Sequence, residues 1–276
     1  MPDKDKTSIT PDLDAGQSLA GMFDLDGQVA FIPGGYGGLG EAIAYGLAMH
    51  GARVVIGGRD STKADALAKK IQLASGTETS AVALDVTDVS TIPGAIDRVV
   101  ERFGRLDALI NCVGMQIEQP LVDVTEEAFD RVYQTNLKSA MFLAQAAAKI
   151  QIAAGRGGRQ IHLLSVRSQL AIRGKGYSAY TATKGGLVML VKQHAMELAP
   201  HGITVNGVAP TFVNTEMIRH VYERPEFKKE ILARIPLGRI ADPSDVVAPV
   251  LFFAAPASGF VTGQILYVDG GITASQ

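Results

Sequence analysis

A short apolar run that leads directly into a glycine-rich turn constrains the fold of this chain most strongly. Residues 29–32 are apolar, and the run PGGYGGLG follows at 33–40. Leu39, Ile43 and Leu47 then repeat with helical spacing, and residues 53–58, RVVIGG, form a second predicted strand. This order predicts a strand–turn–helix–strand unit. In such a unit the glycines let the backbone approach a pyrophosphate, and the helix N-terminus offers free N–H groups. The alternative is a turn that only tolerates glycine.

The end of the second predicted strand should face the adenosine ribose of a dinucleotide. An acidic side chain there binds the 2′-hydroxyl of NAD(H), whereas a nearby cation accommodates the 2′-phosphate of NADP(H). In this chain the strand ends with Gly57 and Gly58, and Arg59 follows. The pattern favours NADP(H), with NAD(H) as the alternative, in which Arg59 lies in solvent and Asp60 faces the ribose.

Strands and helices continue to alternate along the rest of the chain. Further strands are predicted at 81–84, 106–110, 161–164, 203–208 and 264–268. Helices are predicted at 61–74 with Ser61 as N-cap, at 87–103, from Thr125 to about 150, from Tyr180 to about 199, and at 245–255. The fold class is therefore α/β, a single Rossmann-type doubly wound domain with a seven-stranded parallel sheet and helices on both faces. We expect a flexible N-terminal tail over 1–23, a catalytic domain over 24–276, and a substrate flap over 211–240.

Polar residues and glycines follow several predicted strands at their carboxyl ends. They comprise the glycine-rich turn, Asp85, the segment 111–114 and Ser165. In open α/β sheets, ligands bind beyond this edge. Asp85 can bond an adenine amino group, or it can cap the helix that follows.

Tyr180 and Lys184 are four residues apart, which on a helix puts both side chains on one face. A tyrosine hydroxyl normally titrates near ~10, and a nearby ammonium favours the phenolate, so we expect a lowered pKa for Tyr180. The pair predicts a general acid/base unit. The alternative is an ordinary exposed helix face.

The composition excludes several classes of function. A net charge of −2 over 276 residues provides no basic excess to bind nucleic acid or an anionic membrane. No apolar run approaches the roughly 20 residues of a membrane span. The single cysteine, Cys112, rules out an internal disulfide and fits a reducing, cytoplasmic compartment. The five histidines show no metal-ligand spacing, so no metal site is predicted.

An ordered series of motifs runs through the chain. It comprises Gly34-x-x-x-Gly38-Leu39-Gly40, Asp85, Asn111-x-x-Gly114, Asn136, Ser165, Tyr180-x-x-x-Lys184, Asn206-x-x-x-Pro210 and Val268-Asp269-Gly270-Gly271. Over about residues 24–273 the chain thereby resembles the short-chain dehydrogenases/reductases of the long-established 250-residue type. Within that family it is most similar to the gluconate 5-dehydrogenases, and nearly as similar to the 3-oxoacyl-carrier-protein reductases.

The resemblance implies roles for four catalytic residues. Tyr180 would pass a proton to or from the substrate oxygen, and Lys184 would lower the pKa of Tyr180 and bind the nicotinamide ribose. Ser165 would polarise the carbonyl, and Asn136 would hold a water that links Lys184 to solvent; the alternative for Asn136 is a satisfied core amide. The expected cofactor-binding residues are Gly34, Gly35, Tyr36, Gly38, Leu39, Arg59, Asp85, Val86, Asn111, Val113, Gly114, Tyr180, Lys184, Pro210, Val213 and Thr215.

The chain departs from the family pattern at several places, including Cys112-Val113 in the segment 111–114 and Thr211 in place of a usual Gly. Pro33 replaces the usual Thr before the glycine motif and removes a backbone donor. The family serine usually precedes its tyrosine by 13 residues, whereas Ser165 precedes Tyr180 by 180 − 165 = 15. We favour Ser165 because it ends a predicted strand, and the following loop can absorb two residues; Ser168 is the alternative.

Three functions compete. The first is an NADP(H)-dependent oxidoreductase on a secondary alcohol or ketone of a sugar acid or polyol. In that case Arg167, Arg173 and Lys175 could receive a carboxylate near Gln116, unless they are solvent-facing loop charges. The second is a 3-oxoacyl-carrier-protein reductase, for which this chain offers only those cations and Arg219 as a docking patch. The third is a dinucleotide-binding regulatory protein without catalysis. The resemblance further implies a homotetramer formed through the long helices and the last strand.

Overall fold

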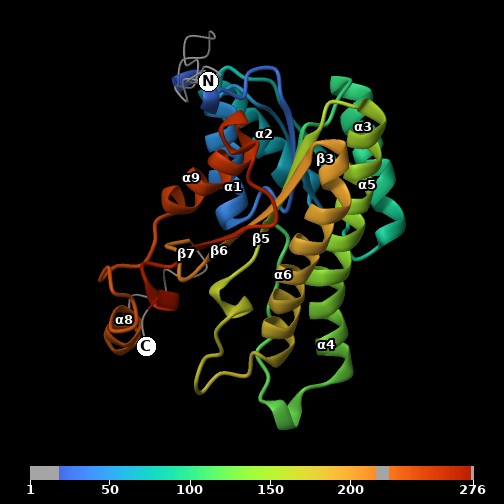
Figure 1. The fold of residues 1–276 in the computed structure, drawn as a ribbon. Helices are drawn as coiled ribbons and strands as arrows, with labels where there is room; N and C mark the ends of the chain where they lie inside the picture. The colour runs from blue at the N-terminus through green and yellow to red at the C-terminus, as the bar shows by residue number, and fades with distance from the viewer. Residues whose placement is uncertain (1–18, 216–223, 275–276) are drawn as a thin grey trace, which may run out of the picture.

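The computed structural model describes residues 19–215 and 224–274. Within those ranges seven strands form one parallel sheet in the order β3-β2-β1-β4-β5-β6-β7 (Figure 1). The strands are β1 (Val29–Pro33), β2 (Arg53–Gly58), β3 (Thr79–Ala83), β4 (Ala108–Asn111), β5 (Gly158–Leu163), β6 (Ile203–Pro210) and β7 (Ile265–Val268). The predicted doubly wound α/β fold is confirmed. The strand order reverses direction between β1 and β4, which is the position where such sheets form a ligand crevice.

Helices cover both faces of the sheet. They are α1 (Gly38–Met49), α2 (Ser61–Ser75), α3 (Ile92–Phe103), α4 (Glu126–Tyr133), α5 (Ser139–Ala154), α6 (Ser178–Leu198), α8 (Pro225–Leu232) and α9 (Pro243–Ala254). α1, α2 and α9 pack on one face, and α3, α5 and α6 pack on the other (Figure 1).

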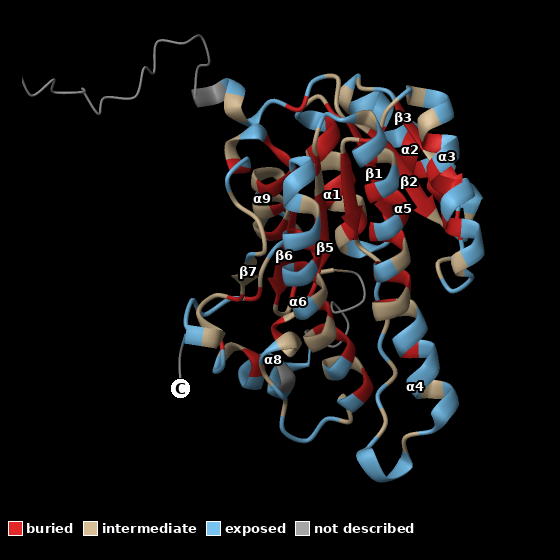
Figure 2. Ribbon diagram, turned by 45° about the vertical axis from the view of Figure 1, so that its right-hand side comes forward, coloured by how far each residue is buried: buried red, intermediate tan, exposed pale blue. Residues whose placement is uncertain are grey.

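Strand β1 shows why the apolar runs of this chain are continuous rather than alternating. Ala30 and Ile32 pack into the core beneath α1, α2 and α9, whereas Val29 and Phe31 pack into the core beneath α3 and α5. Successive side chains of a strand point to opposite faces, and here both faces are buried. Figure 2 shows the strands buried between the helix layers, while much of α4 is exposed. Burying each large apolar side chain stabilises the fold by about 1.5–3 kcal/mol.

Several helix limits differ from the sequence-based predictions; α3, for example, begins at Ile92 rather than at residue 87. Asp60, not Ser61, is the N-cap of α2, because its side chain accepts a hydrogen bond from the Lys63 backbone N–H at 3.0 Å. Thr125 caps α4 as expected, but the predicted long helix is interrupted by a π-helical turn, η4 (Gln134–Lys138), before α5 begins.

The peripheral segments are only partly described. Residues 1–18 of the predicted tail lie outside the described residues, and residues 19–23 form a 3₁₀ turn, η1 (Leu19–Phe23), that contacts η7 (Pro256–Ser258). In the predicted flap, positions 216–223, including Arg219, also lie outside them. The described part of the flap contains α8 and a small apolar cluster of Ile231, Ile235 and Ile240. Across the described ranges, no helix combines the length and apolar character that crossing a bilayer requires.

Candidate active site

The glycine-rich loop after β1 lies directly against the loop after β4. Gly34 has φ +76°, and a Cβ placed on it would lie 3.0 Å from the carbonyl carbon and oxygen of Cys112. Cys112 N–H in turn donates to the Pro33 carbonyl at 3.0 Å. Gly34 is therefore required both for its left-handed backbone and for this close approach. The two loops meet at the reversal point of the strand order, where the sequence placed the dinucleotide.

The N-terminus of α1 is open at this edge. Its N-cap is Gly37, and no side chain caps the helix. Gly38, with φ +39°, faces Thr215, whose methyl group would lie 3.5 Å from a Cβ at position 38. Because the first N–H groups of a helix have no intrahelical partner, this end is suited to bind an anion such as a phosphate.

The end of β2 is covered by a side chain from the glycine-rich loop. The ring of Tyr36 lies so close over Gly58 that no Cβ fits there, and the Tyr36 hydroxyl accepts a hydrogen bond from the Asp60 N–H at 3.3 Å. The Asp60 carboxylate caps α2. Arg59 is exposed and, among the described residues, forms no hydrogen bond or ion pair. The small residue at the end of β2 therefore makes room for Tyr36.

Two further predicted cofactor residues stabilise the loops that carry them. Asp85 is exposed, and its Oδ1 accepts hydrogen bonds from the Thr87 N–H at 3.0 Å and from the Thr87 hydroxyl at 2.8 Å. The hydrogen bond from the Thr87 backbone lowers the pKa of Asp85. The N-cap of the turn that follows is Asp88, so the helix-cap alternative for Asp85 is wrong. Val86 packs against the core beside α3.

The loop after β4 is held by a buried amide. Asn111 Oδ1 accepts from the Val113 N–H at 3.1 Å, and Asn111 Nδ2 lies 3.4 Å from His162 Nδ1. A Cβ on Gly114 would lie 3.5 Å from Lys184 Nζ. The segment 111–114 therefore connects the glycine-rich loop to the lysine of α6.

The segment after β6 continues along the same edge. Pro210 is the last residue of β6 and pairs with Val268. Val213 is buried and forms a bridge with Ala241, and its carbonyl accepts from the Thr215 N–H at 2.7 Å. The chain thus turns back towards Gly38 and α1.

Tyr180 and Lys184 lie on one face of α6, as their spacing predicted. Lys184 Nζ lies 5.7 Å from the centre of the Tyr180 ring and donates to the Leu163 carbonyl at 2.8 Å, at the end of β5. Lys184 is buried, and burial lowers its pKa to about 8. The ammonium is thus fixed beneath the tyrosine by a backbone carbonyl rather than by a carboxylate.

The predicted lowering of the Tyr180 pKa is wrong for this structure. Burial raises the pKa of Tyr180, and hydrogen bonding to Ser165 and the charge of Arg167 only partly oppose that shift. The Lys184 ammonium donates its hydrogen bond to the Leu163 carbonyl. The tyrosine is therefore held as a neutral phenol, which is a proton donor.

The structure brings Ser165, and not Ser168, to the tyrosine. Ser165 interacts with Tyr180 and also accepts from the Arg167 N–H at 3.2 Å. Ser168 lies in the 3₁₀ turn after Ser165, and its hydroxyl is 3.3 Å from the hydroxyl of Tyr267 on β7. That turn and the loop over 169–177 account for the longer spacing to Tyr180.

Asn136 lies in the π-helical turn and is fully buried. Its Oδ1 accepts from the Met115 N–H at 2.8 Å, and its Nδ2 donates to the Met115 carbonyl at 2.9 Å and to the Thr183 hydroxyl at 3.1 Å. The amide therefore joins the loop after β4 to the residue that precedes Lys184. Thr183 was missed by sequence reasoning, although it lies inside the Tyr-x-x-x-Lys motif.

Two loops beside the tyrosine are fixed to each other. The Gln119 N–H donates to the Gly176 carbonyl at 3.0 Å, and Gly176 packs so tightly on the Gln119 carbonyl that a Cβ cannot fit. Lys175 forms an ion pair with Glu118 at 3.2 Å. In Figure 1 the loop over 169–177 extends below the sheet at the same end of the molecule as α8. Arg173 and Gln116 are exposed.

The ring of Tyr177 meets that of Tyr180 edge to face, with centroids 6.3 Å apart.

In the described parts of the chain, no three His, Cys, Asp or Glu side chains gather closely enough to hold a metal ion.

Comparison with known proteins bears on this arrangement. Residues 35–273 match a family model described as enoyl-(acyl carrier protein) reductase. The gluconate 5-dehydrogenase of Gluconobacter oxydans is 36% identical over 92% of this chain and 98% of its own length. The 3-oxoacyl-[acyl-carrier-protein] reductase of Thermotoga maritima is 34% identical over 90% and 98%. A crystal structure of a Burkholderia cenocepacia gluconate 5-dehydrogenase in complex with NADP and tartrate is 35% identical, with a TM-score of 0.89 over 94% of this chain and 100% of that one.

The chain belongs to the short-chain dehydrogenase/reductase family. The family resemblance inferred from the motifs is thereby confirmed. As a short-chain dehydrogenase/reductase, the protein is an oxidoreductase of CH–OH groups. Because these relatives are named as dehydrogenases and reductases, the hypothesis of a regulatory protein without catalysis is not supported.

Proposed function

We propose that this short-chain dehydrogenase/reductase transfers a hydride between NADP(H) and a secondary alcohol or ketone of a sugar acid or polyol. The observation that carries the proposal is the assembly at one sheet edge. Tyr180, Ser165 and Lys184 gather at the carboxyl end of β5, and the loop after β4 connects them to the glycine-rich loop. This puts proton-transfer groups beside a dinucleotide crevice.

The residues at the crevice fit a dinucleotide with a 2′-phosphate. Gly34 and Gly38 have positive φ values that shape the glycine-rich loop, and the uncapped α1 N-terminus suits a pyrophosphate. Arg59 stands at the end of β2 with its guanidinium exposed, suited to bidentate contact with a phosphate. Asp60 is engaged as a helix cap, which favours the NADP(H) prediction over the alternative that Asp60 binds the ribose.

The chain's own residues would manage the proton. Bound NADP(H) would supply or accept the hydride. Because burial raises the pKa of Tyr180, the phenol is protonated at neutral pH and can donate its proton to a developing alkoxide. Ser165 would donate a hydrogen bond to the same oxygen, which stabilises charge as it forms. Lys184 would supply a fixed positive charge beneath Tyr180, and Asn136 would position the segment that carries it.

Support for the substrate class comes from relatives. The most similar ones include proteins named gluconate 5-dehydrogenase, 2-dehydro-3-deoxy-D-gluconate 5-dehydrogenase and sorbitol dehydrogenase. The second candidate, a 3-oxoacyl-carrier-protein reductase, has a relative of comparable identity. It would need a basic docking patch, but Lys175 is neutralised by Glu118 and Arg167 is half-buried. Of the cations that the structure describes, this leaves Arg173 as the exposed one without an ion pair among the described residues, which is too little for a docking patch and favours the small-molecule substrate.

A cofactor and substrate screen tests this function. We expect NADPH to bind more tightly than NADH, and to be oxidised with keto acids or ketoses but not with a 3-oxoacyl carrier protein. Arg59→Ala should weaken NADPH by about 10- to 100-fold and NADH by only a few-fold, because it removes a charged contact that only the 2′-phosphate makes. Arg156→Ala, an exposed arginine before β5 at the opposite edge of the sheet, is the control. Equal losses for both cofactors would reject the phosphate contact.

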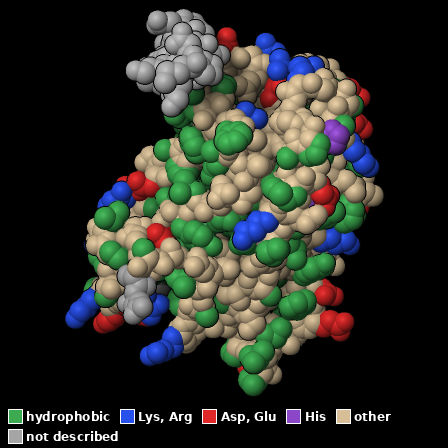
Figure 3. All heavy atoms as spheres, viewed as in Figure 1, with side chains coloured by type: hydrophobic (Ala, Val, Ile, Leu, Met, Phe, Trp, Pro, Cys, Tyr) green, Lys and Arg blue, Asp and Glu red, His purple; other side chains and the backbone are tan. Residues whose placement is uncertain are grey.

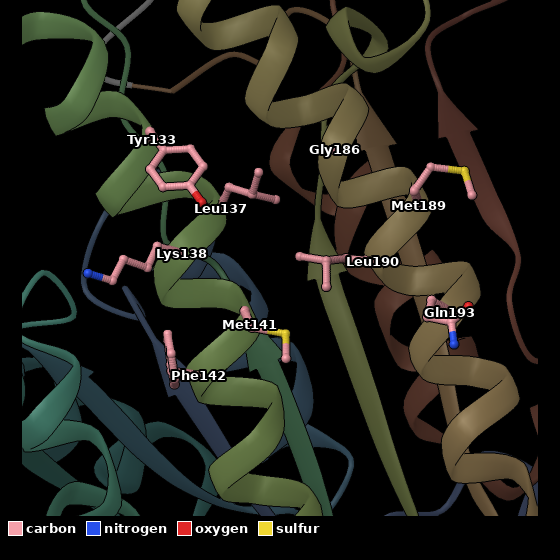
Figure 4. A pocket seen from close by; sticks show the side chains of 9 residues that line it. All are labelled: Tyr133, Leu137, Lys138, Met141, Phe142, Gly186, Met189, Leu190 and Gln193. Carbon is pink, nitrogen blue, oxygen red and sulfur yellow. The ribbon is translucent and has the colours of Figure 1, made fainter. Parts of the chain in front are cut away.

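We further propose that the enzyme is a homotetramer in the cytoplasm. The proposed location rests on the single cysteine, which fits a reducing compartment. The proposed assembly rests on the apolar surface of α4, α5 and α6. Between these helices lies an open groove of about 360 Å³ lined by Leu137, Met141, Met189 and Leu190 among others (Figure 4). Figure 3 shows hydrophobic side chains on the surface over the same helices. A second copy of the chain would cover them in an isologous contact.

A further inference from the structure

We propose that Arg167 is the residue that recognises a carboxylate on the substrate and so selects sugar acids over neutral polyols. This inference rests on the function proposed above and assigns one residue of the three-cation cluster to that task. Arg167 follows Ser165 by two residues, in the 3₁₀ turn Val166–Ser168 at the carboxyl end of β5. The guanidinium thus belongs to the same wall of the site as the serine and tyrosine hydroxyls.

The Arg167 side chain is held in place by its own loop. Its Nη1 donates to the Leu170 carbonyl at 3.3 Å and to the Ala171 carbonyl at 2.9 Å, and its backbone N–H donates to Ser165 Oγ at 3.2 Å. The two bonds to the Leu170 and Ala171 carbonyls use only Nη1 of the guanidinium. They leave the rest of the planar fork, which suits bidentate contact with a carboxylate. The residue is preorganised, because little side-chain freedom remains to be lost on binding.

The charge of this guanidinium is not balanced within the described residues. Arg167 is half-buried and forms no ion pair with any of them. Burial lowers the pKa of Arg167; Tyr177 opposes this shift, and the positive charge of Arg234 adds to it. Arg234 is paired with Glu230, whereas no carboxylate among the described residues pairs with Arg167, so an anion bound beside the Arg167 guanidinium would be stabilised. Arg234 comes from the residues just after α8, on the flap side of the site.

The other candidate cations do not share this environment. Lys175 is paired with Glu118 at 3.2 Å, and Arg173 is exposed. Arg167, in contrast, is electrostatically coupled to both Tyr177 and Tyr180. A carboxylate bound to Arg167 would therefore lie close to the reacting oxygen but on a different carbon of the substrate.

Calorimetry of dead-end complexes tests the inference without turnover. The enzyme saturated with NADPH is titrated with gluconate and with sorbitol, which differ at C1 by a carboxylate against a hydroxymethyl group. We expect gluconate to bind at least about tenfold more tightly. Arg167→Gln should abolish this preference, so that gluconate and sorbitol bind about equally, and Arg167→Lys should keep part of it because the charge remains. Arg173→Gln, on the same loop, should retain the preference.

Three outcomes would overturn the inference. They are a wild type without preference for gluconate, a preference that survives Arg167→Gln, or a preference that Arg173→Gln removes equally well. Because NADPH and gluconate cannot react with each other, none of these outcomes depends on turnover. The proposed oxidoreductase function is judged separately, by NADPH oxidation on the ketone panel. If ketones are turned over while gluconate shows no preference, the function stands and the role of Arg167 fails.

Discussion

At the scale of single residues, Lys184 carries the clearest electrostatic cost in the site. Its ammonium is buried and bonded to the Leu163 carbonyl, and burial lowers its pKa to about 8, below the ordinary value of 10.5. Between pH 8 and pH 10.5 the Lys184 side chain is therefore protonated in the unfolded chain and deprotonated in the folded chain. In that window unfolding takes up a proton, so the stability contributed by this residue rises with pH.

This sign leads to a prediction for Lys184→Met. Below pH 8 the wild type bears the full cost of a buried charge, and between pH 8 and 10.5 that cost disappears. The unfolding free energy of the variant minus that of the wild type should fall by about 3 kcal/mol from pH 7 to pH 10. Urea unfolding across this range measures it. Lys192→Met, at an exposed position on α6, is the control, and its unfolding free energy should differ from that of the wild type by the same amount at every pH. If the unfolding free energies of Lys184→Met and the wild type change in parallel with pH, the cost assigned to the buried charge is refuted.

Single-residue predictions succeeded where they concerned position and failed where they concerned environment. Spacing predicted that Tyr180 and Lys184 share a helix face, which the structure bears out. It could not predict the direction of the Tyr180 pKa shift, since this depends on how deeply the phenol is buried. The prediction of Ser61 as the N-cap of α2 is wrong by one residue, because Asp60 is also of a residue type that suits an N-cap. The hydrogen bond from Lys63 decides between them.

At the scale of elements, the glycine-rich loop is the most constrained feature. Gly34 has φ +76°, and a Cβ added to it would lie 3.0 Å from the Cys112 backbone. Gly27 has a similar φ of +72°, but a Cβ added to it would have no atom within 4 Å. Gly27→Ala should cost about 1–2 kcal/mol of unfolding free energy from backbone strain alone. Gly34→Ala should cost more than that, because it also separates the loops after β1 and β4.

Urea unfolding and NADPH titration of both variants check this prediction. We expect Gly34→Ala to weaken NADPH by at least about tenfold, since the loop would no longer fit closely around a pyrophosphate. Gly27→Ala should leave NADPH affinity unchanged. If the two variants lose the same stability, the contact with Cys112 carries no cost.

Element types were predictable from periodicity, and some interruptions were not. The strand at 53–58 has the predicted limits, because its apolar residues 54–56 lie between the helix end near Gly51 and the glycine pair 57–58. The π-helical turn at Gln134–Lys138 had no recognisable signal beyond Asn136 within an apolar stretch. Tertiary bonds from Asn136 to Met115 and Thr183 accompany that turn, and a local pattern cannot register such distant partners.

At the scale of the whole molecule, the doubly wound topology brings distant segments to one edge. The fold was predictable because the central strands are buried on both faces and helices connect the parallel strands. The oligomeric state was not predictable from the sequence, because apolar residues of α5 and α6 lie both in the internal core and on the surface. Leu143 and Leu187 are buried, whereas Met141 and Met189 are exposed on the same helices.

The proposed tetramer leads to a prediction for Met189→Glu. Met189 on α6 and Met49 at the end of α1 are both 61% exposed. A charge at 189 should be buried unpaired in an isologous contact and shift the protein towards smaller species, because an unpaired charge costs several kcal/mol at an interface. Met49→Glu should leave the mass unchanged. Light scattering after size-exclusion chromatography measures both, and a wild type that runs as a monomer would contradict the proposal.

The most direct test of the account is turnover by Tyr180→Phe. The variant loses only the hydroxyl that would donate the proton, so NADPH affinity should stay within about threefold while NADPH oxidation on the best ketone substrate falls by at least about 100-fold. Tyr133→Phe, at an exposed position on α4, should behave as the wild type does. Tyr180→Phe with turnover near that of the wild type would contradict the assignment of Tyr180 as the proton donor.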